Sequence, residues 1–165
     1  YTSGDDALDT FVADIVDANT NASMTREEML RAVYVYVRDH GLYKKGNLYS
    51  VGDTGWEIPD ALIMFQKWKG NCYNFTAAFW SLARGIGFDA VCYSGLVGVG
   101  RDPHSWVEIT FDGIPYVFDV ETEMSYRLVN DYITSMYRKT YEEVAAWSYV
   151  RTPEEAAATA PETAG

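Results

Sequence analysis

A cysteine, a histidine and an aspartate at separate points of the chain could act together on a carbonyl group, and the cysteine has the most unusual position. Cys72 lies in GNCYNF, between a Gly-Asn pair and a run of apolar residues at helical spacing, so it should begin a helix. There, the positive end of the helix dipole and unpaired backbone N–H groups favour the thiolate. From position alone, a nucleophile and a structural cysteine are equally good interpretations.

The histidine and the aspartate lie in segments with the alternating pattern of β-strands, HSWVEITF and IPYVFDVE. The Asp112-Gly113 pair between them is the strongest short hairpin signal in the chain, and it sets Phe111 opposite Ile114. Continuing this register gives one nearly all-apolar face and places His104 and Asp119 on the other, as diagonal neighbours roughly 7–8 Å apart at the backbone. An imidazole and a carboxylate can meet across that distance.

Together these residues predict a Cys-His-Asp arrangement for nucleophilic acyl transfer. Asp119 would fix the tautomer of His104 and stabilise its charged form, and the imidazolium would favour the thiolate of Cys72. The backbone N–H of Cys72 would point towards a developing oxyanion. A second oxyanion donor is expected among three residues close in sequence to the cysteine: Gln66, Trp68 and Asn71.

Helical and strand patterns occupy different halves of the chain, which predicts an α+β fold. The helices are expected near 5–17, 25–39 and 59–68, and from Cys72 to Gly85 or Gly87. The strands are expected over 88–99, 104–111 and 114–121. Residues 41–58 should form a long irregular loop, and 132–147 fit either a helix or a mixture of strand and helix.

Length and composition limit the range of functions. The 165 residues suffice for one domain, expected over 1–151, followed by a linker-like acidic Ala/Thr/Pro tail over 152–165. A formal charge of −11 argues against nucleic acid and anionic membrane as partners. No apolar run is long enough to span a membrane, and the residue spacings fit no metal motif.

Three motifs in order resemble the bacterial transglutaminase-like superfamily: KWKGNCYNFTAAFWSLARGIGFDAVCYSG, then HSWVEI, then YVFDVE. This resemblance covers about residues 58–121 and implies a papain-like fold, with N-terminal helices and a central helix packed on an antiparallel sheet. It also implies Cys72 as nucleophile, His104 as general base and acid, and Asp119 as the orienting carboxylate. The family's usual Pro after the Asp is replaced by Val120, and Glu121 follows on the face expected for His104. Either carboxylate could orient the histidine, and the motif favours Asp119.

The function expected from this resemblance is a cysteine hydrolase that cleaves peptide or other amide bonds through a thioester, without a cofactor. The alternatives are a cross-linking transglutaminase and an inactive binding module of the same fold. Hydrolysis is favoured because a small domain has few elements with which to exclude water from the thioester. Candidates for the substrate groove are three aromatic residues: Tyr49, Trp56 and Trp106.

The expected partner is a protein or peptide, including the peptide of a cell wall. The acidic tail and the absence of a starting Met favour an extracellular or cell-surface location over a cytoplasmic one. Cys92 is expected to be a small buried apolar residue, and a disulfide with Cys72 would inactivate a thiol enzyme.

Overall fold

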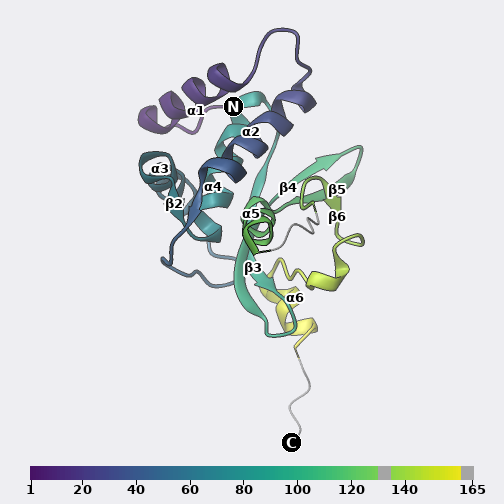
Figure 1. The fold of residues 1–165 in the computed structure, drawn as a ribbon. Coiled ribbons are helices and arrows are strands. Elements are labelled where there is room, and N and C mark those ends of the chain that lie inside the picture. The colour runs from purple at the N-terminus through teal and green to yellow at the C-terminus, as the bar shows by residue number, and fades with distance from the viewer. Residues whose placement is uncertain (130–134, 161–165) are drawn as a thin grey trace, which may run out of the picture.

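Helices come first along the chain and an antiparallel sheet follows (Figure 1). The computed structural model describes residues 1–129 and 135–160. The helices before the sheet are α1 (Asp6–Asn19), α2 (Arg26–His40), α3 (Glu57–Lys67) and α4 (Cys72–Ile86). The later helices are α5 (Val120–Val129), the 3-10 turn η1 (Ala145–Trp147) and α6 (Pro153–Ala158). The fold is therefore α+β, as the sequence predicts.

The short strands β1 (Leu42–Tyr43) and β2 (Lys69–Gly70) pair in parallel, so the loop after α2 starts with two residues of regular structure. The main sheet has the order β3 (Val91–Val97), β4 (Asp102–Phe111), β5 (Ile114–Phe118) and β6 (Lys139–Thr140). The predicted hairpin is present, with Phe111 opposite Ile114 and Val107 opposite Phe118. Asp112 and Gly113 have φ values of 52° and 79°, the positive values that a two-residue type I′ turn requires.

Helix α4 is the centre of the core, because the other layers pack around it. It contacts α1, α2, α3, α5 and β4, and its side chains Phe75, Phe79 and Leu82 are fully buried. In Figure 1, α1, α3 and α4 lie to the left of β4, β5 and β6, and α5 packs against α2 and α4. Gly87 ends α4 with a φ of 113°, which settles the predicted end of this helix.

The prediction of a strand over 114–121 is wrong at its end. β5 stops at Phe118, and α5 begins at Val120. Asp119 caps this helix, since its Oδ1 accepts a hydrogen bond from the Thr122 backbone N–H at 3.2 Å. The alternating pattern of residues continues through Glu121, but the capping interaction determines the backbone there.

Both faces of the main sheet are covered. One face packs on α4, and the other carries a small second core of Trp106, Val117, Met136 and Val144. The segment after α5 supplies this cover, and within 132–147 the described part contains β6 and η1, while 132–134 lie outside the described residues. The terminal segment is not entirely linker-like, because α6 accepts a hydrogen bond at Ala156 O from Arg101 Nη2 at 2.7 Å.

Within the described ranges, no helix is both long and apolar enough to cross a bilayer.

We expect Gly95→Ala to destabilise the protein by about 1–3 kcal/mol, the usual effect of overpacking a filled site. A Cβ at this position would collide with the backbone carbonyl of Val150 and would contact the Trp106 ring, neither of which can move independently of the sheet. Urea unfolding measures the loss. Gly100→Ala is the matched control, because its Cβ would meet only Asp102 at ordinary contact distances of 3.4–3.8 Å. Equal stability of the two variants would contradict the packing described here.

Candidate active site

Cys72 is the first residue of α4, and the preceding Asn71 fixes the start of the helix. The Asn71 side chain accepts from the Tyr73 N–H at 3.1 Å, and the Asn71 backbone N–H donates to Asn74 Oδ1 at 3.0 Å. This reciprocal capping ends the strand β2 and sets the backbone of Cys72 in helical geometry. As a first-turn residue, Cys72 has a backbone N–H without an acceptor inside the helix. The residue is only 7% exposed, on the edge of the core.

His104 lies on β4 with its ring buried between the sheet and α5. Its Nε2 is 2.8 Å from Asp119 Oδ2. An ionised carboxylate can only accept, so Nε2 carries a proton and donates it. The remaining nitrogen, Nδ1, is then available to Cys72, which is close enough to contribute to the raised pKa of His104. The imidazole therefore lies between the thiol and the carboxylate.

Asp119 is fully buried and surrounded by donors. Besides His104, its Oδ2 accepts from Tyr149 Oη at 2.6 Å and from Thr122 Oγ1 at 2.9 Å. Its Oδ1 accepts the capping bond from the Thr122 N–H. Thr122 Oγ1 also lies 3.2 Å from His104 Nε2. Hydrogen bonds of this number to a carboxylate favour its ionised form even where it is shielded from solvent.

The electrostatics of the pair are consistent with this geometry. Burial lowers the pKa of His104, but the charge and hydrogen bond of Asp119, followed by the contact with Cys72, raise this pKa well above its usual value of 6.5. Burial raises the pKa of Asp119, but the charge of His104 and the hydrogen bonds from His104, Tyr149 and Thr122 bring it below the usual value of 3.8. The pair thus stays ionised across neutral pH.

The sign of each shift gives its effect on stability. The contribution of His104 is complete below pH 6.5 and is lost as the pH rises through its raised pKa. The contribution of Asp119 is complete above pH 3.8 and is lost as the pH falls through its lowered pKa. The contribution of the pair to stability is therefore complete between pH 3.8 and pH 6.5.

Glu121 lies beside the pair but bonds elsewhere. Its Oε1 accepts from Ser125 Oγ at 2.8 Å. Burial raises its pKa, which the positive charge of His104 partly counteracts. Donor atoms of His104, Asp119 and Glu121 lie within 4.8 Å of one another, close enough to share a cation, but the His104–Asp119 hydrogen bond already occupies one atom of each. The carboxylate that bonds the imidazole is Asp119.

The residues expected to supply a second oxyanion donor are dispersed. The Asn71 Nδ2 is engaged, because it donates to Asn47 O at 2.7 Å. Gln66 is exposed near the end of α3. Trp68 ends that helix in the left-handed conformation, with a φ of 53°, and its ring packs against Tyr36 of α2.

Two of the predicted groove residues belong to the core instead. Trp106 is fully buried, stacks on Tyr93 and donates from Nε1 to Tyr141 Oη at 2.9 Å. Trp56 is 5% exposed and stacks on Tyr49, whose hydroxyl donates to Asp60 Oδ2 at 2.8 Å. Trp56 and Trp106 are therefore core residues, whereas the partly buried Tyr49 also lines a pocket beside the start of α4.

Thr122 and Tyr149 could not be recognised from the sequence, whereas Tyr43 belongs to the loop over 41–58 that was expected to be functional. Thr122 stands at the third helical position after Asp119, a capping signal that the strand pattern concealed. Tyr149 reaches Asp119 from thirty residues away, without any local signal. Tyr43 on β1 lies at the rim of the site. Burial raises its pKa, as do the negative charges of Glu121 and Cys72.

A profile of the transglutaminase-like superfamily matches residues 10–118. The chain belongs to the transglutaminase-like superfamily. The matched range holds the helices, Cys72 and His104, and Asp119 follows it directly. No curated protein sequence matches the chain significantly.

A solved structure with a TM-score above 0.5 has a fold similar to that of this transglutaminase-like chain. The structure described as "a Putative Cysteine Protease from Cytophaga hutchinsonii" gives a TM-score of 0.54 at 16% identity, covering 94% of this chain and 44% of that one. A structure described as "a TGase" gives a TM-score of 0.47 at 17% identity, covering 69% of this chain and 31% of that one. The chain spans less than half the length of either protein.

We expect His104 to remain a doubly protonated imidazolium well above pH 6.5 in the native protein. In Asp119→Asn, the pKa of His104 should no longer be raised. Without the carboxylate, burial dominates and favours the neutral imidazole. The chain has two histidines, so ¹³Cε1 NMR of the protein, with His40→Gln for assignment, follows His104 alone. Glu121→Gln is the matched control and should shift the titration less. If Glu121→Gln lowers the pKa of His104 more than Asp119→Asn does, Glu121 is the orienting carboxylate.

We expect iodoacetamide at pH 6.5 to label Cys72 in the native protein and to leave Cys92 unmodified. The protonated His104 can hold the Cys72 thiolate as an ion pair, whereas burial raises the pKa of Cys92 well above 9.0. Peptide mapping measures both sites, since both cysteines are free. When the protein is unfolded in urea, Cys72 and Cys92 should react with iodoacetamide alike. Preferential labelling of Cys92 in the native state would contradict this arrangement.

Proposed function

We propose that the chain is a thiol-dependent acyl-transfer enzyme that hydrolyses peptide or other amide bonds through a thioester. The observation that supports this proposal most strongly is the buried pair of His104 and Asp119, 2.8 Å apart, together with Cys72 as the first residue of α4 and near enough to influence the pKa of His104. A buried ion pair of this kind contributes little net stability, so stability alone does not account for its presence. It is the geometry that nucleophilic catalysis requires.

The proposed reaction begins when the thiolate of Cys72 attacks the carbonyl carbon of the amide. The C–S bond forms while the carbonyl electron pair moves to oxygen, and the orphan N–H of Cys72 donates to that oxyanion. When the oxyanion collapses, the C–N bond breaks and His104 gives its proton to the leaving amine. The products of this half are the free amine and a thioester on Cys72.

In the second half, neutral His104 accepts a proton from water as the water oxygen attacks the thioester carbonyl. Collapse of this second oxyanion breaks the C–S bond and releases a carboxylic acid, while the thiolate and the imidazolium are restored. Asp119 remains ionised throughout and stabilises the imidazolium. Tyr149 and Thr122 act through Asp119, whose orientation they fix.

Water is the proposed acyl acceptor because Trp56, the largest aromatic residue of the loop that could have enclosed an amine channel, is buried in the core. Trp56 is buried against Tyr49 and Tyr73, and Tyr49 is bonded to Asp60. Cross-linking requires that water be kept away from the thioester, and the buried Trp56 is not available to form a wall over it. The proposed substrates are proteins or peptides, including cell-wall peptides.

We expect a peptide mixture to yield amine and carboxylic acid fragments with the native protein and none with Cys72→Ala, which lacks the nucleophile. Mass spectrometry detects both kinds of product, and added lysine-bearing peptide tests transfer to an amine. Fragments should exceed isopeptide products. If isopeptide products dominate, the proposed activity is cross-linking and hydrolysis is the minor reaction. No Cys72-dependent product from any mixture would favour the inactive binding module.

A further inference from the structure

The lysines of this acidic protein are concentrated in one place. The chain carries 24 acidic and 13 basic residues, and five of the basic ones are lysines. Four of these line a single pocket of about 180 Å³, here called the lysine pocket. Its basic residues are Lys44, Lys45, Lys67 and Lys69. Such clustering makes one positive region on a surface that is otherwise negative.

The lysine pocket is held in place by backbone and side-chain contacts. The Lys44 N–H donates to Gly70 O at 2.8 Å, as part of the pairing of β1 with β2. At the other end of the loop, Asn71 Nδ2 donates to Asn47 O at 2.7 Å. β2 lies between α3 and α4, which fixes the second side of the pocket (Figure 1).

None of the four lysines forms an ion pair with an acidic residue in the part of the chain that the structure describes. Within residues 1–129 and 135–160, each ion pair uses an arginine or His104 as its cation. The carboxylate that lines the pocket is Asp60, which is 6% exposed and whose Oδ2 accepts from Tyr49 Oη. An anion entering the pocket therefore meets lysines that no carboxylate has neutralised.

The lysine pocket adjoins the nucleophile. Its wall includes Gly70, Asn71 and Asn74, which lie on both sides of Cys72 in sequence and form the start of α4. Lys69 is three positions before Cys72 in the sequence, so their Cα atoms are at most about 11 Å apart. An extended substrate advances about 3.3 Å per residue, so a group in the pocket would be within about three residues of the scissile bond.

We propose that the lysine pocket is an anion subsite that binds a carboxylate of the acyl-transfer substrate, so that the preferred substrate is an acidic peptide. This inference rests on the proposed function. The volume is below the roughly 300–1,000 Å³ of small-molecule and cofactor sites and suits a single side chain. The positive end of the α4 dipole acts in the same direction as the lysines. Ammonium groups on flexible stems can accommodate a side-chain or a terminal carboxylate.

The test compares two acetylated, amidated peptide mixtures that differ only in Glu or Gln at one fixed position. We expect kcat/KM for the Glu mixture to be about fivefold or more higher at low salt, which corresponds to two partly exposed ion pairs. The ratio should fall towards one in 0.5 M NaCl and in Lys45→Gln/Lys69→Gln. Lys139→Gln is the matched control, because this fifth lysine lies on β6 outside the pocket, and it should leave the ratio unchanged. A Gln mixture whose peptides have a free C-terminus tests whether the pocket binds a terminal carboxylate as well as a side-chain carboxylate.

Binding to the Cys72→Ala protein, followed by NMR titration with the same mixtures, separates this inference from the proposed function. If neither mixture is cleaved but the Glu mixture binds more tightly, and the double variant removes this difference, the subsite stands and the enzymatic proposal fails. If both mixtures are cleaved equally, or if the preference persists in the double variant, the subsite proposal is overturned. Stronger competition by inorganic phosphate than by glutarate would overturn the assignment to a carboxylate.

Discussion

The hydrogen-bonded ion pair between His104 and Asp119 is the interaction on which the rest of the site depends. His104 Nε2 and Asp119 Oδ2 are 2.8 Å apart, and both side chains are shielded from solvent. Moving two charges out of water is unfavourable by several kcal/mol per ion unless the remaining lone pairs are satisfied. The structure meets this requirement at Asp119, where Tyr149 and Thr122 supply the additional donors. A carboxylate so placed can orient an imidazole without competing water.

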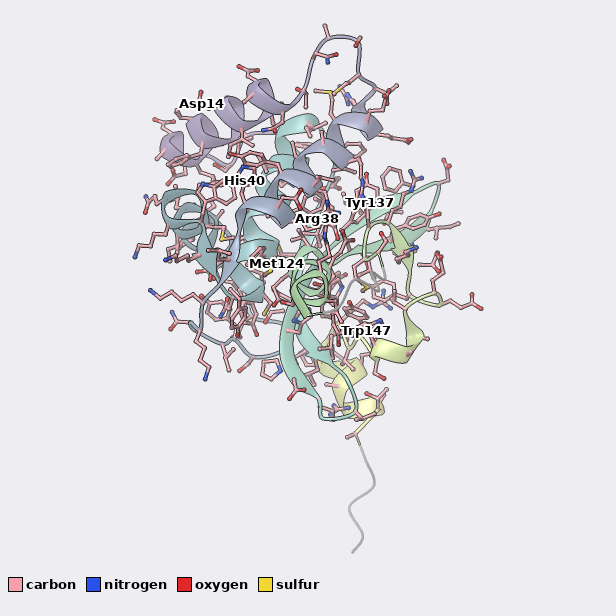
Figure 2. The ribbon with its side chains drawn as sticks, in the orientation of Figure 1. Asp14, Arg38, His40, Met124, Tyr137 and Trp147 are labelled. Atoms are coloured by element: carbon pink, nitrogen blue, oxygen red, sulfur yellow. The ribbon has the colours of Figure 1, made fainter. Side chains whose placement is uncertain are left out.

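The fold positions this pair with elements that have other structural roles. Asp119 is both the partner of His104 and the cap of α5, so the same residue ends β5 and begins a helix. The first turn of α5 also carries Glu123, which accepts from Arg38 at 2.7 Å and from Tyr34 at 3.0 Å. Figure 2 shows Arg38 and Met124 where α2 and α5 meet. These contacts fix α5 against the helical layer and, with it, the position of Asp119.

Much of this arrangement could be predicted from the sequence because it depends on short-range signals. The Asp112-Gly113 turn determines the hairpin register, and the Gly-Asn pair before Cys72 marks the start of α4. Thr152-Pro153 with Glu155 is a signal of the same kind, but the low-complexity composition concealed the start of α6.

What could not be predicted depends on contacts between distant segments. Tyr149 lies thirty residues after Asp119, and its approach is possible because Gly95 leaves room for the Val150 carbonyl beside the sheet. Aromatic composition likewise does not distinguish a groove from a core. Trp106 was expected in a groove, yet the segment from Met136 to Val150 covers it. The clustering of four lysines also requires the fold, because 44–45 and 67–69 meet only through the pairing of β1 with β2.

The central claim is that Cys72, held by His104 and Asp119, forms a covalent thioester with an acyl donor. The most direct measurement is the mass of the tryptic peptide containing Cys72 after brief exposure to substrate peptides and an acid quench. The account predicts an added acyl mass on Cys72 that neutral hydroxylamine removes and that is absent in His104→Ala. A native protein in which Cys72 never gains a hydroxylamine-sensitive mass, while amide bonds are still cleaved, would contradict it.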